Sequence, residues 1–264
     1  MPLYRLTLEY DGTDLYGSQV QANGRTVQGE LEQAIQTLTG TGTRLAFAGR
    51  TDRGVHAIGQ VASGEIPWNG SPQELRRSLN GVGPADIVVS DVALVESGFH
   101  ARFSAMWREY RYRVIVAETE PVLMRRYAWW RRSPIDAGLA QDACDALVGT
   151  HSFGSFASGG WSQALTPEQM VRTVYVCQWR QQQSELIASG QAYELRIVAS
   201  GFLPQMVRNI TSAVVRVGSG DAPAAWIREV LDAGDRGAMQ AGAPPQGLAL
   251  WRVGYTEFDN GSEA

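Results

Sequence analysis

The stretch "RLAFAGRTDRGVHAIGQVASGEI", residues 44–66, sets a polar, glycine-rich loop between two apolar segments. Residues 44–49 and 60–66 are short, largely apolar runs bounded by turn residues, which is typical of strands. The loop between them carries a single acid, Asp52, and the glycines near it allow the backbone to bend sharply. The sequence therefore predicts a strand, a tight loop and a strand that together present one carboxylate.

Two arginines, Arg50 and Arg53, flank this acid. Their guanidinium groups favour the ionised carboxylate, which suits a nucleophile or an electrostatic stabiliser better than a proton donor. General acid–base hydrolysis would want a second carboxylate, and the loop has none. Because a turn aspartate often binds its own backbone, a structural role for Asp52 stays open at this point. His56, four residues later, either supports the carboxylate or bonds within the turn.

Outward from this loop, strand and helix patterns alternate along the chain. Residues 4–10, "YRLTLEY", alternate strictly between two faces and predict a half-buried strand. Thr26 and Ser71 are expected to cap helices, the latter in a capping box with Glu74 and with Pro72 at the first helical position. We expect further strands at residues 86–95, 109–118, 171–179, 193–202 and 248–255, and helices at residues 26–40, 71–82, 136–149, 204–218 and 224–234.

This order of elements predicts an α+β protein made of two similar α/β sandwich halves. We expect an N-terminal half, residues 1–133, that carries the Asp52 loop, and a C-terminal half, residues 134–264, that completes the site. No low-complexity linker separates the halves, so we expect their antiparallel sheets to adjoin around a central cleft. In the helix at residues 204–218, an apolar stripe leaves Arg208 and Asn209 off the buried side.

Composition removes several classes of protein. The chain has 264 residues, 44% hydrophobic and 19% charged, which fits a globular protein with a core. No apolar run approaches the ~18 residues of a membrane span, and the N-terminus lacks a signal-peptide pattern, so we expect a cytoplasmic protein. All 23 basic residues are arginine, which excludes lysine-dependent chemistry such as Schiff bases or a P-loop.

The cysteines and histidines give no sign of a metal site or of another cofactor site. Cys144 and Cys177 form no CxxC pattern, and the three histidines show no ligand spacing. Cys144 lies at a helix-core spacing close to two aspartates, which predicts a buried structural thiol rather than a nucleophile.

The charge is unevenly distributed. Residues 100–132 hold eight arginines against three acids, whereas residues 219–264 hold seven acids against three arginines. Arginine forks bind phosphate and stack on bases, and tyrosines and tryptophans are interleaved with them in the basic stretch. This composition is compatible with RNA binding and equally with a solvated strand face.

Several separated motifs, in order, resemble one family over nearly the whole chain. "YDGTDLYGSQVQ", "RTVQGELEQAI" and "AGRTDRGVHAIGQV" are similar to N-terminal and active-site signatures of the TruA-type tRNA pseudouridine synthases. "FHARFSAMWREYRY", "GTHSFGSF", "GFLPQMVRNI" and "GLALWRV" are similar to the later segments of that family. The resemblance implies two RRM-like or ferredoxin-like α/β sandwich halves with adjoining antiparallel sheets around a central cleft.

The resemblance also implies roles for individual residues. Asp52 corresponds to the nucleophile, Tyr110 to a tyrosine that packs on the target base, and Arg208 to an arginine paired with the catalytic aspartate. Arg50 corresponds to the residue that occupies the space left by the flipped nucleotide. Further candidates for substrate binding are His56, and His100 and Arg102 in "FHARFSA", which either contact RNA phosphate or brace the strand that follows.

The implied reaction is isomerisation of uridine to pseudouridine at positions 38, 39 and 40 of the tRNA anticodon stem-loop, by a homodimer without metal or cofactor. Two positions depart from the family pattern. Ser18 stands where a large aromatic is usual, and Gly83 where a leucine is usual.

Two other functions compete with this one. A non-catalytic RNA-binding module of two RRM-like halves explains the arginines and aromatics but not the carboxylate in the basic loop. A hydrolase that uses Asp52 and His56 on a phosphodiester lacks further metal-binding acids.

Overall fold

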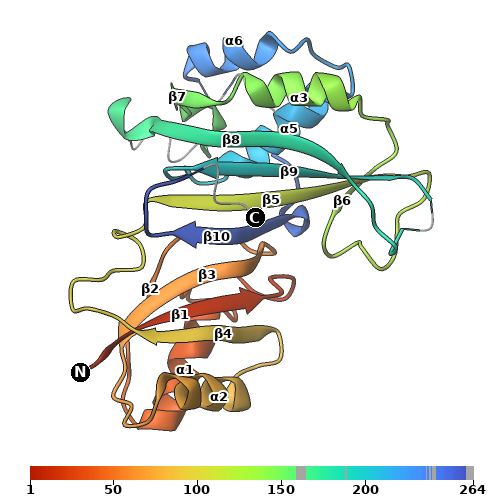
Figure 1. Ribbon diagram of the computed structural model, residues 1–264. Coiled ribbons are helices and arrows are strands. Elements are labelled where there is room, and N and C mark those ends of the chain that lie inside the picture. The colour runs from red at the N-terminus through yellow and green to blue at the C-terminus, as the bar shows by residue number, and fades with distance from the viewer. Residues whose placement is uncertain (159–164, 188, 236, 238, 240–241, 260–264) are drawn as a thin grey trace. The chain divides into compact units, whose positions relative to one another are not determined.

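The computed structural model describes residues 1–264 except 159–164, 188, 236, 238, 240–241 and 260–264 (Figure 1). The chain divides into two compact units, Met1–Met106 with Ala249–Ala264, and Trp107–Leu248. Each unit combines helices with a mostly antiparallel sheet, which confirms the predicted α+β class. The functional halves expected at residues 1–133 and 134–264 stay a prediction, because compactness does not tell which segments complete a site.

The first unit contains a sheet in the order β4-β1-β3-β10, with β2 paired to β3. The pairing is antiparallel except between β3 and β10, which run parallel through His56 and Ala57. The bounds are β1 Leu3–Tyr10, β2 Ala46–Phe47, β3 His56–Glu65, β4 Ile87–Leu94 and β10 Leu248–Gly254. Strand β3 begins at residue 56, earlier than the predicted 60, because the loop ends with the turn at Gly54.

The first strand shows the predicted alternation. Tyr4, Leu6, Leu8 and Tyr10 are buried on one face, whereas the side chains between them are partly or fully exposed. Helices α1 (Val27–Thr39) and α2 (Pro72–Val82) lie against one face of this sheet (Figure 1). The burial of alternate residues therefore follows from a sheet with a single covered face.

The ends of α1 and α2 follow the predicted capping chemistry. The Thr26 hydroxyl accepts from the backbone N–H of Gly29, and Gly40 ends α1 in the left-handed region at φ 71°. The capping box between Ser71 and Glu74 is confirmed, with Pro72 as the first residue of α2. These local bonds satisfy backbone groups that a helix end otherwise leaves unpaired.

The second unit contains a sheet in the order β5-β9-β8-β7, with β6 parallel to β5. Its strands are β5 Trp107–Val116, β6 Trp129–Arg131, β7 Gly149–Ser152, β8 Val171–Gln182 and β9 Gln191–Ala199. Its helices are α3 Ala137–Asp145, α5 Met206–Gly218 and α6 Trp226–Ala233, and its short 3-10 turns are Gly154–Phe156, Glu168–Met170 and Pro245–Gly247. Strands β6 and β7 were not predicted, because three or four residues are too few to show a period.

Helices α3 and α5 both contribute buried side chains to the core of the second unit. The apolar stripe of α5 is buried as predicted, but Asn209 is buried as well, because its amide donates to the carbonyl of Phe156 at 2.7 Å. Cys144 is a buried free thiol, as predicted. A hydrogen bond with Cys177, together with burial, raises the pKa of Cys144 well above its ordinary value, so the thiolate is disfavoured.

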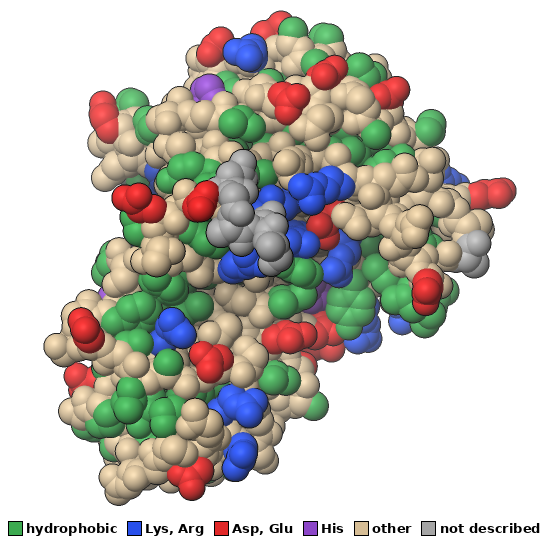
Figure 2. All heavy atoms as spheres, viewed as in Figure 1, with side chains coloured by type: hydrophobic (Ala, Val, Ile, Leu, Met, Phe, Trp, Pro, Cys, Tyr) green, Lys and Arg blue, Asp and Glu red, His purple; other side chains and the backbone are tan. Residues whose placement is uncertain are grey.

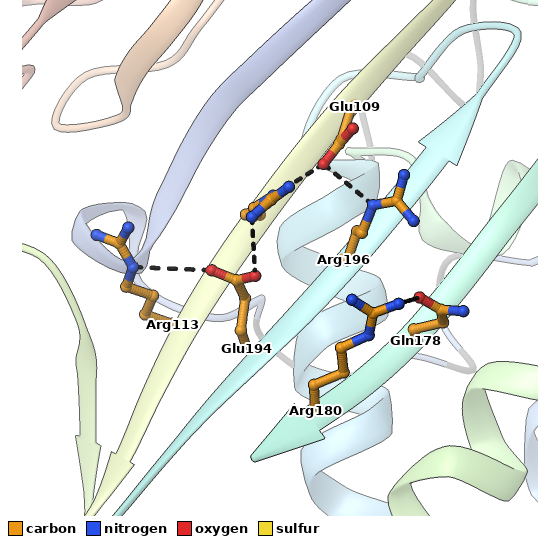
Figure 3. A network of polar contacts seen from close by, with 7 residues as sticks. Glu109, Arg113, Gln178, Arg180, Glu194 and Arg196 are labelled. Atoms are coloured by element: carbon orange, nitrogen blue, oxygen red, sulfur yellow. Dashed lines mark hydrogen bonds and ion pairs between the residues drawn. The ribbon is translucent and has the colours of Figure 1, made fainter. Parts of the chain in front are cut away.

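The face of this sheet with Glu109 and Arg111 carries a buried ionic network (Figure 3). One carboxylate oxygen of Glu109 accepts from Arg111 Nε at 2.8 Å and from Arg196 Nε at 3.1 Å. Glu194 lies 3.4 Å from Arg111 and 3.9 Å from Arg113. Figure 2 shows basic and acidic side chains mixed over β5 and β9. Part of the basic stretch that the sequence shows is therefore neutralised within the unit.

Removing the central acid of this network is expected to destabilise the protein strongly. Glu109 is only 1% exposed, and Arg196 only 3%, so Glu109→Ala leaves a buried guanidinium without its carboxylate. We expect a loss of roughly 3–5 kcal/mol in the free energy of unfolding. Urea titration measures it, and Asp91→Ala is the matched control, because Asp91 pairs with Arg5 at the surface and is expected to lose at most about 1 kcal/mol. Equal losses in the two variants would contradict the role given to burial.

Candidate active site

The loop that carries Asp52 lies between β2 and β3, and its three charged side chains are exposed. The N–H of Val55 donates to the carbonyl of Asp52 at 3.1 Å and closes a tight turn. Gly54 in that turn has φ 79°, a conformation that side chains with a Cβ rarely adopt. The sharp bend expected from the glycine is therefore present, and it holds Asp52 at the surface between Arg50 and Arg53.

Ser18 holds the residue that precedes Asp52. Its N–H donates to the carbonyl of Thr51 at 3.1 Å, and its hydroxyl accepts from the Thr51 N–H at 2.9 Å. Ser18 is 1% exposed, so both bonds are shielded from water. A Cβ on the neighbouring Gly17 would lie 2.6 Å from the Thr51 carbonyl oxygen, so the close approach requires glycine there. Sequence reasoning noted Ser18 only as a departure from the family pattern and missed this contact.

The buried side chains of Tyr10 and Gln60 also bind this loop. The Tyr10 hydroxyl lies 2.8 Å from the Thr51 hydroxyl, and the Gln60 amide donates to Tyr10 at 3.3 Å and to the Gly49 carbonyl at 2.9 Å. Burial raises the pKa of Tyr10 to about 12, although the hydrogen bonds with Thr51 and Gln60 act in the opposite direction. Strands β1 and β3 thus fix both the beginning and the middle of the loop.

His56 lies at the end of the loop and is largely buried. Its Nδ1 accepts from the N–H of Gly12 at 3.0 Å and lies 3.2 Å from a carboxylate oxygen of Asp11. These contacts join the turn after β1 to the start of β3, and a contact of His56 with substrate stays a prediction.

Arg53 is engaged by an aromatic ring. Its guanidinium carbon lies 4.2 Å from the ring centroid of Tyr16, within the range of a cation–π contact. A Cβ on Gly24, which has φ 111°, would lie 2.5 Å from the same ring. The sequence predicted neither contact, because the ring comes from a loop with no periodic pattern.

Tyr110 and Arg208 lie in the second unit. Tyr110 on β5 is buried and meets Phe202 edge to face, with ring centroids 5.0 Å apart. Arg208 stands in the first turn of α5, where its Nε donates to the carbonyl of Ala243 at 2.7 Å. Burial raises the pKa of Tyr112 well above its usual range, and the positive charge of Arg208 opposes that increase. The charge of Arg208 at the start of α5 therefore acts on the buried Tyr112 side chain of β5.

The residue before α5 has an unusual backbone. Gln205 adopts φ 62°, the left-handed region, and is the only non-glycine residue with positive φ in the described part of the chain. Its side chain caps nothing, although its carbonyl accepts from the N–H of Asn209 at 3.0 Å. Such outliers cost about 1–3 kcal/mol each, and this one lies directly before the helix that carries Arg208.

His100 and Arg102 lie on the loop that follows β4. The His100 Nδ1 accepts from the backbone N–H of Arg102 at 3.1 Å, so the ring braces the loop. The side chain of Arg102 is exposed. The first unit thus contains Arg50, Asp52 and His56 in one region and His100 and Arg102 on another loop. Arg208 belongs to the second unit, and its pairing with Asp52 stays a prediction.

Among the described residues, no group of three or more histidine, cysteine or acidic side chains is placed to hold a metal ion. No helix in the described ranges is both long and apolar enough to cross a membrane.

Comparison with known proteins decides the family. A family model described as tRNA pseudouridine synthase matches residues 7–104 and 143–256. The chain belongs to this family.

Relatives named tRNA pseudouridine synthase A agree with the family match along nearly the whole chain. One from Geobacillus kaustophilus is 41% identical over 251 residues, covering 95% of this chain and 93% of that protein. Others come from Agrobacterium fabrum, 38% identical over 97% of this chain and 94% of the relative, and Rhodospirillum rubrum, 40% identical over 97% and 88%. The resemblance seen in the sequence motifs is thereby confirmed, and the chain is an isomerase of the tRNA pseudouridine synthase family.

The hold of Ser18 on the loop can be tested by removing its hydroxyl. Ser18→Ala leaves the buried N–H of Thr51 without an acceptor, and we expect a loss of roughly 1–3 kcal/mol in unfolding free energy. Ser90→Ala is the matched control, because that hydroxyl binds a backbone carbonyl at an exposed position. Chemical denaturation measures both, and a loss in Ser18→Ala no larger than in the control would contradict the proposed hold.

The buried Tyr10 hydroxyl predicts a pH dependence. Tyr10 stays neutral in the folded protein up to about pH 12, whereas tyrosine in an unfolded chain ionises near pH 10. The stability that this difference contributes is complete below about pH 10 and is lost between about pH 10 and 12, amounting to about 3 kcal/mol at most.

Comparison with Tyr10→Phe isolates this contribution. The difference in unfolding free energy between wild type and the variant is expected to be constant from pH 7 to 9 and to decrease above pH 10. Urea titrations at several pH values measure it. A difference that stays constant up to pH 12 would show that Tyr10 is not shielded as described.

Proposed function

We propose that this chain isomerises uridine to pseudouridine at positions 38, 39 and 40 in the anticodon stem-loop of tRNA, with Asp52 as the nucleophile. The observation that carries the proposal is the Asp52 loop. It holds an exposed carboxylate between two arginines on a turn that is fixed by buried bonds to Ser18 and Tyr10. A rigid support of this kind is what a reacting group needs, because small displacements reduce the rate strongly.

The reaction breaks the bond between N1 of uracil and C1′ of ribose and forms a bond between C5 and C1′. The proton on C5 must leave and N1 must gain one, so the atoms balance without any co-reactant. A single carboxylate that assists detachment of the uracil suffices to begin this exchange. The absence of a second acid in the Asp52 loop agrees with that chemistry better than with acid–base hydrolysis.

The roles proposed for the second unit follow from its side chains. Tyr110 would pack on the flipped base, with Phe202 bracing its ring from the edge. Arg208 would pair with Asp52, and its bond to the Ala243 carbonyl fixes the orientation of the guanidinium group. Arg50 would occupy the space that the flipped nucleotide leaves, because a planar guanidinium both stacks and binds phosphate.

The finer architecture is also part of the proposal. Each unit combines an antiparallel sheet with helices, which supports two RRM-like halves whose sheets adjoin around a central cleft. We further propose that the protein acts in the cytoplasm as a homodimer. Contacts of His56, His100 and Arg102 with the RNA belong to the same proposal.

A direct test uses an unmodified tRNA transcript with a uridine in the anticodon stem, incubated with the protein in the presence of a chelator. Wild type is expected to form pseudouridine and leave the strand intact. Asp52→Asn is expected to bind the RNA with unchanged affinity and form no product. Arg208→Gln is expected to fold and to lose rate at least about tenfold, since a charge partner of the nucleophile typically contributes more than 1.4 kcal/mol.

Asp91→Asn is the matched control, because it removes an exposed carboxylate on β4 and is expected to leave the rate unchanged. Strand cleavage by wild type would favour a hydrolase, and binding without product would favour an RNA-binding module. A collapsed melting transition in either site variant would mean that its residue serves the fold.

A further inference from the structure

Phe103 is the most exposed large apolar side chain in the part of the chain that the structure describes. Its side chain is 77% exposed, more than any other large hydrophobic residue there. A single exposed apolar residue needs no explanation by itself, so its neighbours decide what the ring can do. Three features of the surrounding loop point to a ligand.

The first feature is that the loop is rigid. The Ser104 N–H donates to the His100 carbonyl at 2.9 Å, and the His100 N–H donates to the Ser104 hydroxyl at 3.0 Å. The buried residue Ala101 is held on both sides, by the Ser63 hydroxyl at 3.0 Å and the Tyr255 hydroxyl at 2.9 Å. The exposed ring is therefore presented by a loop that is already ordered, and binding would lose little entropy.

The second feature is the orientation of His100. Its Nδ1 accepts from the backbone N–H groups of Arg102 at 3.1 Å and Phe103 at 3.3 Å. The neutral imidazole therefore carries its proton on Nε2, where it is a hydrogen-bond donor. The imidazole and phenyl centroids are 4.4 Å apart with the planes tilted by 33°, so the imidazole packs obliquely against the phenyl ring, and Phe103 is still 77% exposed.

The third feature is a cation near the outer edge of the cation–π range of the Phe103 ring. The guanidinium carbon of Arg102 lies 5.7 Å from the centroid of the Phe103 ring, and the side chain is exposed. Each of these groups matches a part of a nucleotide. The aromatic face can stack on the base, and the N–H donor and the guanidinium group can bind the oxygens of the negatively charged phosphate. A second copy of the chain, joined through apolar contact alone, would not use the two polar groups.

We propose that Phe103, together with His100 and Arg102, forms a stacking platform for an unpaired nucleobase of the tRNA substrate, separate from the base that is isomerised. The base lies on the phenyl ring, and Arg102 and the His100 Nε2–H contact the adjoining phosphate. The inference rests on the proposed function, since it supplies a second point at which the same RNA is held.

The test measures equilibrium binding of an unmodified tRNA transcript to Phe103→Ala, Phe103→Leu and Phe103→Trp at one salt concentration. Phe103→Ala is expected to bind roughly 5- to 150-fold more weakly, the range that one base–aromatic stack supplies. Phe103→Trp is expected to bind as wild type does. Phe103→Leu keeps apolar area but has no aromatic face, so it is expected to stay weakened.

Leu123→Ala is the matched control, because Leu123 is 69% exposed on another loop and has no place in the platform. It is expected to bind tRNA as wild type does, and all variants are expected to keep the wild-type melting temperature. Wild-type affinity in Phe103→Ala would overturn the proposal. A Phe103→Ala variant that loses self-association in sedimentation while tRNA affinity is unchanged would overturn it as well and assign the ring to a contact between copies.

The same samples are assayed for pseudouridine, which separates the two proposals. If wild type forms no pseudouridine but its RNA binding depends on Phe103, the proposed function fails and the platform stands. If wild type forms pseudouridine and Phe103→Ala binds tRNA normally, the platform fails and the proposed function stands.

Discussion

The candidate site depends on two hydrogen bonds between Ser18 and the backbone of Thr51. One residue donates to the Thr51 carbonyl and accepts from its N–H, so the peptide groups on both sides of Thr51 are held. The next residue is Asp52, which is exposed. The two bonds restrict the backbone that precedes Asp52, so they help to keep the turn in one conformation. Tyr10 and Gln60 make further buried hydrogen bonds to the same loop.

Much of the fold could be predicted because its signals are local. Strict alternation in β1, the caps of α1 and α2 and the stripe of α5 each arise from residues within one or two turns of each other, and each is present. What failed needed partners that are distant in sequence. Asn209 is polar but buried, since the carbonyl that it binds belongs to Phe156, and the short strands β6 and β7 exist because longer neighbours pair with them.

The candidate site divides in the same way. Asp52 and its turn follow from the glycines and charges of one stretch, whereas the role of Ser18 could not be read from the sequence, because it needs two loops to meet. The number of arginines in the sequence likewise overstates the positive charge that the sheet presents. Arg111 and Arg196 share the carboxylate of Glu109, so part of the basic stretch in the sequence is paired with acids within the sheet (Figure 3). Guanidinium groups that remain exposed include those of Arg50 and Arg102, which lie on loops.

The parallel pairing of β3 with β10 has a consequence for biosynthesis. Strand β3 starts directly after the Asp52 loop, and beside His56 and Ala57 it is paired with residues that the ribosome adds almost two hundred positions later. Until Ala249 and Leu250 emerge, that edge of the first unit has no strand beside it from this pairing, while the whole second unit has already been translated. Until then, the start of β3 presents an open strand edge next to the Asp52 loop. The first unit is therefore finished by residues that are translated after the second unit.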